Sequence, residues 1–198
     1  MVRFLVYIKH HLGVIWTLIE WTNTILFKWF YSKRLNRIIS TIFEKNADSV
    51  ISFRKLGKQD MVELESFFHK QPESAFLFFK PHGFSLEDLI SKNKDQSFIM
   101  IGAYVGEKLV GYCFLRCFFN RQAFRGKIVD VNYQGRGIAK KMGMLTSKLC
   151  LELGFRLFAT ISKDNVKSIA SSKAVNEIRV VKELPDNYMY VEYLLKKE

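Results

Sequence analysis

Large apolar residues dominate the chain from Leu12 to Tyr31, and polar residues interrupt them at regular intervals. The interruptions come three or four positions apart, a spacing that lines them along one stripe of a helix and leaves a wide apolar face opposite. These positions are Gly13, Thr17, Glu20, Thr24 and Lys28. A helix that crossed a bilayer would carry Glu20 and Lys28 through hydrocarbon, at about 2.5 to 3.5 kcal/mol for a central charge. The pattern therefore predicts an amphipathic helix that lies in an interface.

Basic residues flank this stretch, and a second, short amphipathic helix is predicted between Leu35 and Phe43. The basic positions are Arg3, Lys9, His10, His11, Lys33, Arg34 and Arg37. Tryptophans next to lysines are typical of a helix at an acidic bilayer surface. Other arrangements remain open: the helix packs back onto the rest of the chain, forms the seam of a homodimer, or spans the bilayer with its charges near the ends. We expect residues 1–45 to contact a membrane surface or a second subunit.

Residues 48–198 contain short apolar runs that predict strands and runs at helical spacing that predict helices. The predicted strands are 49–56, 97–104, 108–118, 128–131, 155–162, 178–181 and 188–195, with a loop at 120–125. The predicted helices are 60–70, one that begins at 85, 138–153 and 165–175. This order indicates an α+β (mixed α/β) domain at 48–198, preceded by an N-terminal amphipathic helical extension at 1–47.

The segment from Gly126 to Lys141 joins a predicted buried strand to the longest predicted helix of this domain, through a turn with Gly135 and Gly137. A helix that begins at Ile138 has backbone N–H groups without intrahelical partners, and the positive end of its dipole reinforces them. Such groups converge on one point and can hold a pyrophosphate. The glycine spacing fits neither the nucleotide-binding P-loop nor the dinucleotide-binding fingerprint. A plain strand-turn-helix connection is the alternative.

The run Gln134-Gly135-Arg136-Gly137-Ile138-Ala139 has Gln, two residues, Gly, one residue and then Ala at the end of the turn. It resembles the acetyl-CoA-binding motif of the GNAT acetyltransferase superfamily, and the order of elements resembles the GNAT arrangement over about three quarters of the chain. The resemblance implies a GNAT-like splayed mixed sheet of about seven strands flanked by helices. It also implies acetyl-CoA as co-substrate. The implied cofactor-binding residues are Ile128, Val129, Gln134, Gly135, Arg136, Gly137, Ile138, Ala139, Lys140 and Asn165.

The catalytic groups depart from the family's pattern. In the family an Asn after the fifth strand contacts the pantetheine arm, and a Tyr seven residues later commonly protonates the leaving sulfur. Asn165 fits this pattern, but Ser172 stands where the Tyr is expected. An aliphatic hydroxyl is a poorer acid than a phenol, so the acid is either Ser172 through water or a tyrosine of the last predicted strand. Those tyrosines are Tyr188, Tyr190 and Tyr193. His82 is the candidate general base, because imidazole titrates near neutral pH and His82 stands where the family's acceptor-binding segment lies.

Composition narrows the partners. The 198 residues are 48% hydrophobic and carry a formal net charge of +12, which favours anionic partners. No nucleic acid is expected, because the chain has no zinc spacing, aromatic RNA-binding signature or long basic run. Basic residues between the third and fourth strands form a solvated rim or help to hold an anion; they are Arg116, Arg121, Arg125 and Lys127. The three cysteines, Cys113, Cys117 and Cys150, have no further ligands at metal-binding spacing, so no metal is expected and they are predicted to be reduced, buried thiols.

These observations lead to one functional hypothesis and one alternative. The first is an acetyltransferase that moves the acetyl group from acetyl-CoA to the primary amine of a small-molecule acceptor, such as an amino sugar, by direct attack in a ternary complex. Ser172 and His82 are its candidate catalytic residues. The alternative is a CoA-binding, membrane-associated scaffold without catalytic turnover. Under both hypotheses we expect the protein in the cytoplasm. If the N-terminal helix binds lipid, we expect peripheral attachment to the inner face of the membrane.

Overall fold

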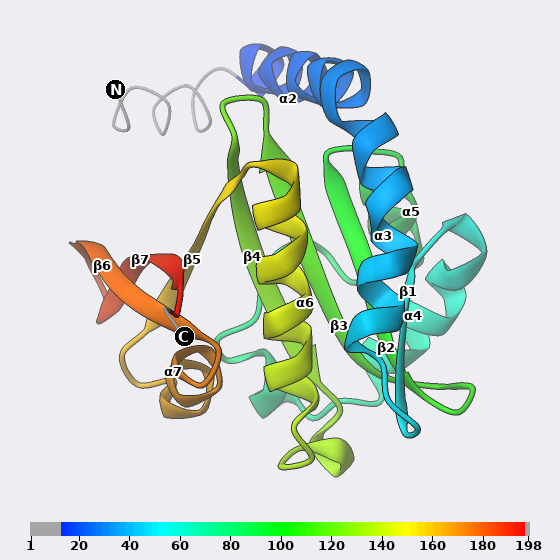
Figure 1. Ribbon diagram of the computed structural model, residues 1–198, viewed down its shortest axis with the longest axis vertical. Helices are drawn as coiled ribbons and strands as arrows, with labels where there is room; N and C mark the ends of the chain where they lie inside the picture. The colour runs from blue at the N-terminus through cyan, green and yellow to red at the C-terminus, as the bar shows by residue number, and fades with distance from the viewer. Residues whose placement is uncertain (1–12, 197–198) are drawn as a thin grey trace.

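A central sheet with helices on both faces forms the body of the protein (Figure 1). The computed structural model describes residues 13–196, with side chains from Thr17 onward. Residues 1–12 lie outside the described residues, and with them the predicted basic positions Arg3, Lys9, His10 and His11. The sheet has the strand order β1-β2-β3-β4-β5-β7-β6. All neighbouring strands are antiparallel except β4 and β5, which run parallel.

The strands are β1 Ile51–Lys55, β2 Phe98–Val105, β3 Lys108–Phe118, β4 Gln122–Val129, β5 Arg156–Ser162, β6 Asn176–Leu184 and β7 Tyr188–Leu195. The helices are α2 Gly13–Phe27, α3 Lys33–Asn46, α4 Met61–His69, α5 Leu86–Asn93, α6 Ile138–Leu153 and α7 Val166–Lys173. A π-helical turn, Lys28–Ser32, joins α2 to α3, and short 3-10 turns lie at Lys58–Asp60, Glu73–Phe76 and Val131–Tyr133.

Each face of the sheet has its own apolar core, because side chains alternate along a strand. On one face α3 and α6 lie side by side and cover the cluster that includes Val129 of β4. On the other face α4 and α5 cover an aromatic-rich cluster that includes Ile128. Neighbouring residues of β4 therefore belong to different cores, and β4 contributes side chains to both faces of the sheet.

The predicted α+β fold is confirmed, with small errors at element boundaries. α6 begins at Ile138 and ends at Leu153 as predicted, and Gly154 closes it in the left-handed conformation. The loop predicted at 120–125 is wrong, because the turn is short and β4 already starts at Gln122. Val131 was predicted in the strand but lies in the 3-10 turn that follows it. The strand predicted at 178–181 is longer, since antiparallel pairing with β7 extends β6 over Asn176–Leu184.

The N-terminal helices form one helical stretch from Gly13 to Asn46 that bends at the π-helical turn, so that α2 crosses the end of the sheet and α3 descends its face (Figure 1). Leu35 and Ile39 of α3 are buried in the core shared with α6. The division into an extension at 1–47 and a domain at 48–198 stays a prediction, although α3 shares its core with the sheet. Among the described residues no helix is both long and apolar enough to cross a membrane.

Candidate functional site

The sheet opens between β4 and β5. Their parallel pairing covers only Gln122–Phe124 opposite Arg156–Phe158, and the strands are not paired beyond Phe124. The backbone N–H of Asp130 donates to the carbonyl of Val110, on the β3 side. Because backbone groups of successive strand residues alternate in direction, Ile128 also turns its N–H and C=O toward β3, whereas those of Val129 turn to the open edge. Of the two strand residues predicted to bind cofactor, Val129 offers its backbone there and Ile128 does not.

The loop after β4 has the conformation expected of an anion cradle. Asp130 caps the 3-10 turn by accepting from the N–H of Asn132 at 2.9 Å. Gly135 and Gly137 then both adopt φ of 78°, a left-handed value that costs a residue with a side chain about 1 to 2 kcal/mol. A Cβ atom at either glycine would meet no atom within 4 Å, so glycine is needed for its backbone conformation and not for space.

Helix α6 begins directly after this turn without a side-chain cap at Gly137. The first N–H of α6 bonded to a helical carbonyl is that of Lys141, which donates to the Gly137 oxygen. The amides of Ile138, Ala139 and Lys140 precede it and point out of the helix end. Gln134, Arg136 and Lys140 are exposed around them. The helix dipole and the charges of Arg136 and Lys140 give the cradle a positive potential that suits a pyrophosphate.

Helix α7 lies next to this loop. Lys167 of α7 donates from Nζ to Gln134 Oε1 at 3.2 Å. Asn165 caps α7, its Oδ1 accepting from the N–H of Ser168 at 3.0 Å, which leaves its Nδ2 group to make other bonds. Asn165 therefore begins the helix whose Lys167 contacts the glycine turn, and its predicted contact with the pantetheine arm stays a prediction.

Ser172, fully buried on α7, is paired with a tyrosine from the last strand. Its Oγ lies 3.2 Å from the hydroxyl oxygen of Tyr193 on β7. Tyr190 instead stacks on Phe124 and Phe158, on the opposite face of the sheet. Of the three tyrosines named as alternatives, Tyr193 is the one that reaches Ser172. The sequence suggested the three tyrosines but could not select Tyr193, because its contact with Ser172 joins residues 21 positions apart on different elements.

Two basic residues of β4, Arg125 and Lys127, point toward α6. The sequence predicts them either in a solvated rim or in contact with an anion. Arg125 is 6% exposed, donates to the Gly143 carbonyl at 2.9 Å and lies over the Tyr193 ring. Lys127 donates from Nζ to the carbonyl of Ala139, in the first turn of α6, at 3.0 Å. Burial, followed by the charge of Arg125, lowers the pKa of Lys127 to about 7. The rim prediction is wrong for both residues, since strand alternation turns them inward.

His82 lies in the loop before α5 and is enclosed by aromatic rings. Its Nδ1 lies 2.6 Å from the Gly83 carbonyl oxygen and its Nε2 lies 3.0 Å from the Tyr112 hydroxyl. A carbonyl only accepts, so Nδ1 carries the proton and Nε2 accepts from Tyr112. Burial lowers the pKa of His82, which keeps the imidazole neutral at pH 7. The sequence offered no signal for Tyr112, because its contact is with His82, 30 positions away in the chain.

The two catalytic candidates lie on opposite faces of the sheet. His82 and Tyr112 belong to the face covered by α4 and α5, whereas Ser172 and Tyr193 lie on the side of α6 and α7. A group held at the open edge of β4 would have a base on one side and a hydroxyl pair on the other. No cluster of His, Cys, Asp or Glu within residues 13–196 could hold a metal ion.

The chain's cysteines are all reduced and buried. Burial raises the pKa of Cys113 and of Cys150 to about 12, and that of Cys117 well above its usual value. A thiolate is therefore scarce at all three positions at neutral pH. None of them is suited to form a covalent acyl intermediate.

Comparisons with known proteins agree with this geometry. A sequence model described as the acetyltransferase (GNAT) family matches residues 59–172. A search among curated proteins found no similar sequence. The fold resembles the GNAT domain of Streptomyces lividans PAT, with 19% identity, a TM-score of 0.63, and 75% of this chain and 96% of that chain covered.

Two further solved structures contain coenzyme A. The PaiA N-acetyltransferase of Thermoplasma acidophilum shares 15% identity with a TM-score of 0.59, covering 72% of this chain and 97% of that chain. An aminoglycoside acetyltransferase in complex with coenzyme A and kanamycin shares 13% identity with a TM-score of 0.58, covering 74% of this chain and 95% of that chain. At these identities the likeness concerns the fold.

Proposed function

The chain belongs to the acetyltransferase (GNAT) family, and from this premise we propose that it transfers an acetyl group from acetyl-CoA to the primary amine of a small-molecule acceptor. The observation that carries the proposal is the uncapped N-terminus of α6 behind the left-handed pair Gly135 and Gly137. A loop of this shape at the end of a strand with an open edge suits a cofactor that has a pyrophosphate and an extended arm.

In this proposal the amides from Gly135 to Lys140 hold the pyrophosphate, and the exposed side chains of Gln134 and Arg136 flank it. The pantetheine arm follows the open edge of β4, where the backbone of Val129 is available, and reaches the Nδ2 group of Asn165. Solved relatives that contain coenzyme A support this assignment. Acetyl-CoA and reduced thiols both favour the cytoplasm as the site of action.

The reaction proceeds by direct attack, in agreement with the absence of a reactive thiol among the chain's three cysteines. The amine nitrogen attacks the thioester carbonyl, the carbon–sulfur bond breaks, and the sulfur takes up a proton. Tyr112 accepts a proton from the amine and transfers its own hydroxyl proton to the neutral His82, to which it already donates a hydrogen bond. Ser172, backed by the Tyr193 phenol, delivers a proton to the leaving sulfur from the other face.

The acceptor we propose is an amino sugar attached to an anionic carrier. The net charge of +12 favours a negatively charged substrate. The solved relative bound to kanamycin supports an amine of a small molecule as acceptor. A screen that compares amino sugars with and without a phosphate-containing carrier, polyamines and peptide N-termini tests this class. Turnover of polyamines or peptides and of no amino sugar contradicts it.

Calorimetric titration with acetyl-CoA tests the cofactor site. We expect Gly137→Asp to weaken binding more than about tenfold, because it places a carboxylate at the pyrophosphate and strains the turn. Gly154→Asp is the matched control, since Gly154 has φ of 76° at the other end of α6 and no atom within 4 Å of an added Cβ. Binding that is unchanged in Gly137→Asp, or equally lost in both variants, contradicts the proposal.

Steady-state kinetics test the catalytic roles. We expect His82→Gln and Ser172→Ala each to lower kcat by about 100-fold while the affinity for acetyl-CoA stays constant, since proton transfer contributes about 100- to 10,000-fold. His69→Gln, on the exposed end of α4, is the control for loss of an imidazole. A kcat unaffected by either substitution removes that residue's role. If no amine releases CoA above the rate with water, the scaffold alternative replaces the enzyme.

A further inference from the structure

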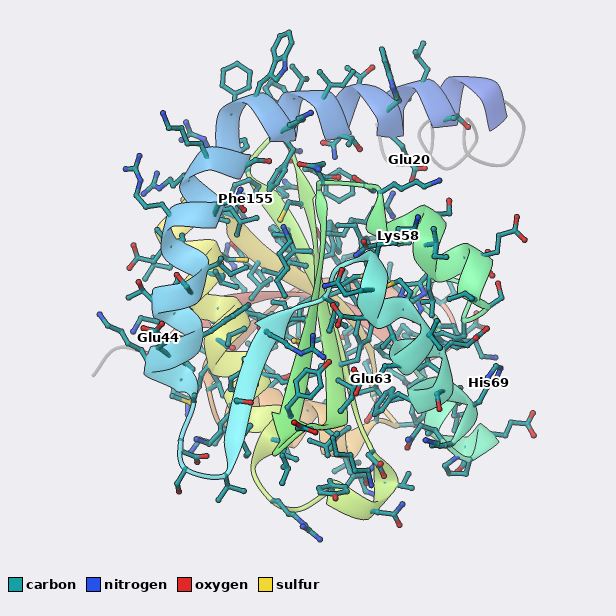
Figure 2. All side chains as sticks on the ribbon, turned by 90° about the vertical axis from the view of Figure 1, so that its right-hand side faces the viewer. Glu20, Glu44, Lys58, Glu63, His69 and Phe155 are labelled. Carbon is teal, nitrogen blue, oxygen red and sulfur yellow. The ribbon has the colours of Figure 1, made fainter. Side chains whose placement is uncertain are left out.

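Helix α2 is fastened to the sheet by its polar side. Glu20 forms an ion pair with Arg116 of β3, with 2.6 Å between Oε1 and Nη2. Asn23 donates from Nδ2 to the Cys117 carbonyl at 3.0 Å and accepts from the N–H of Phe119 at 2.8 Å. Figure 2 shows Glu20 on the side of α2 that faces the sheet. The contacts fix how α2 is rotated about its axis.

The opposite side of α2 is apolar and exposed. We define the outer face as the large apolar side chains of α2 and the π-helical turn that are more than half exposed: Leu18, Trp21, Trp29 and Phe30. Their exposed fractions are 57%, 61%, 75% and 65%, in that order. Several large aromatic side chains exposed on one segment of the surface mark an interaction surface. Since Glu20, Asn23 and Thr24 are bonded to the body of the protein, rotation of α2 cannot bury this face without breaking those contacts.

The charges around the outer face are of one sign. Between Thr17 and Arg37 the only acidic residue is Glu20, which is paired with Arg116 beneath the helix. The exposed basic residues of the same stretch are Lys28, Lys33, Arg34 and Arg37. A partner must therefore offer apolar contact together with negative charge.

This requirement selects among the occupants. A second copy of the chain would bring two basic clusters together, which is unfavourable at close range. The chain's own first 12 residues contain no acidic residue either. An anionic phospholipid surface supplies both features, because tryptophan rings lie at the headgroup level and lysine and arginine pair with acidic headgroups.

We propose that the outer face of α2 docks on an anionic phospholipid surface, with the helix parallel to the membrane plane. The contact is independent of acetyl transfer, because no residue of the outer face belongs to the proposed cofactor or catalytic machinery. The face is small, so the attachment is reversible and depends on the headgroup charge.

Vesicle binding of the full chain tests the proposal, with two readouts. The chain's three tryptophans stand at positions 16, 21 and 29, so tryptophan emission, excited selectively over tyrosine, reports on this segment alone. With vesicles of phosphatidylglycerol and phosphatidylcholine we expect co-sedimentation and a blue shift of the emission. Vesicles of phosphatidylcholine alone should bind the protein at least about tenfold more weakly, and raising NaCl from about 0.05 M to about 0.5 M should release it.

Leu18→Glu, which places an acid on the outer face and keeps all three tryptophans, should reduce the partition onto anionic vesicles at least about tenfold. Val62→Glu, at an exposed position of α4, is the matched control and should bind as the native chain does. Failure of the native chain to bind anionic vesicles overturns the proposal, as does equal binding to both kinds of vesicle. A dimer in light scattering without lipid that Leu18→Glu dissociates assigns the face to a second copy instead.

Discussion

The amine of Lys127 lies in the protein interior and donates to a carbonyl group and not to a carboxylate. Burial is the main cause that lowers its pKa from 10.5 to about 7, and the charge of Arg125 adds to it. In the unfolded chain the amine keeps its proton up to about pH 10.4. Between these two pKa values the unfolded state binds more protons than the folded state, so the free energy of unfolding increases as pH rises through this window.

We therefore expect native stability to rise from pH 7 to pH 9, relative to the variant Lys127→Met, by up to about 1.4 kcal/mol per pH unit. Urea unfolding followed by circular dichroism at several pH values measures the difference. Lys148→Met, which removes an exposed lysine of α6, is the control and should follow the native curve. Native and Lys127→Met curves that stay parallel over this range would show that Lys127 keeps its proton in the folded state.

At the scale of single residues, local chemistry was predictable and long-range pairing was not. Gly137 and Gly154 could be placed from the sequence, because a left-handed turn at a helix end demands glycine whatever surrounds it. Tyr112 and Arg125 could not. Tyr112 has its role through a loop residue 30 positions away, and Arg125 through a helix and a strand that the fold brings together.

Among the elements, α2 is predicted as a helix from its sequence pattern, but the pattern does not say which side of the helix faces the sheet. The spacing of its polar residues predicts a stripe, but the partners of that stripe come from β3 and from the loop before β2. Asn23, which bonds to the Cys117 carbonyl, the Phe119 amide and the Ser97 hydroxyl, was not singled out by the sequence pattern.

We expect Asn23→Ala to loosen α2 by about 1 to 3 kcal/mol, because it removes hydrogen bonds to partly buried backbone groups of the sheet edge. The loss should be local, so hydrogen exchange of the amides in α2 should become faster while those in α6 keep their protection. Thr22→Ala, which removes an exposed hydroxyl bonded only within its own helix, is the control. Unchanged exchange in α2 would mean that the apolar contacts of Phe27 suffice to hold it.

For the whole molecule, α2 and the glycine turn at residues 134–137 lie at opposite ends of α6. The loop precedes Ile138 at one end, and Phe155, just past the other end, packs against Phe27 and Tyr31 (Figures 1 and 2). Sixteen residues at a rise of 1.5 Å separate the ends by about 24 Å. A protein docked through α2 would thus present its cofactor loop to the solution.

Because its three cysteines are buried, the folded protein should resist oxidation and alkylation at its thiols. Oxidants and alkylating reagents act on exposed thiolates, and neither condition is met while α6 covers the sheet. Damage by peroxide should therefore fall first on the exposed Met144 and spare the sulfur atoms of the core. The rate at which a maleimide reacts with the cysteines would therefore measure how often α6 separates from the sheet.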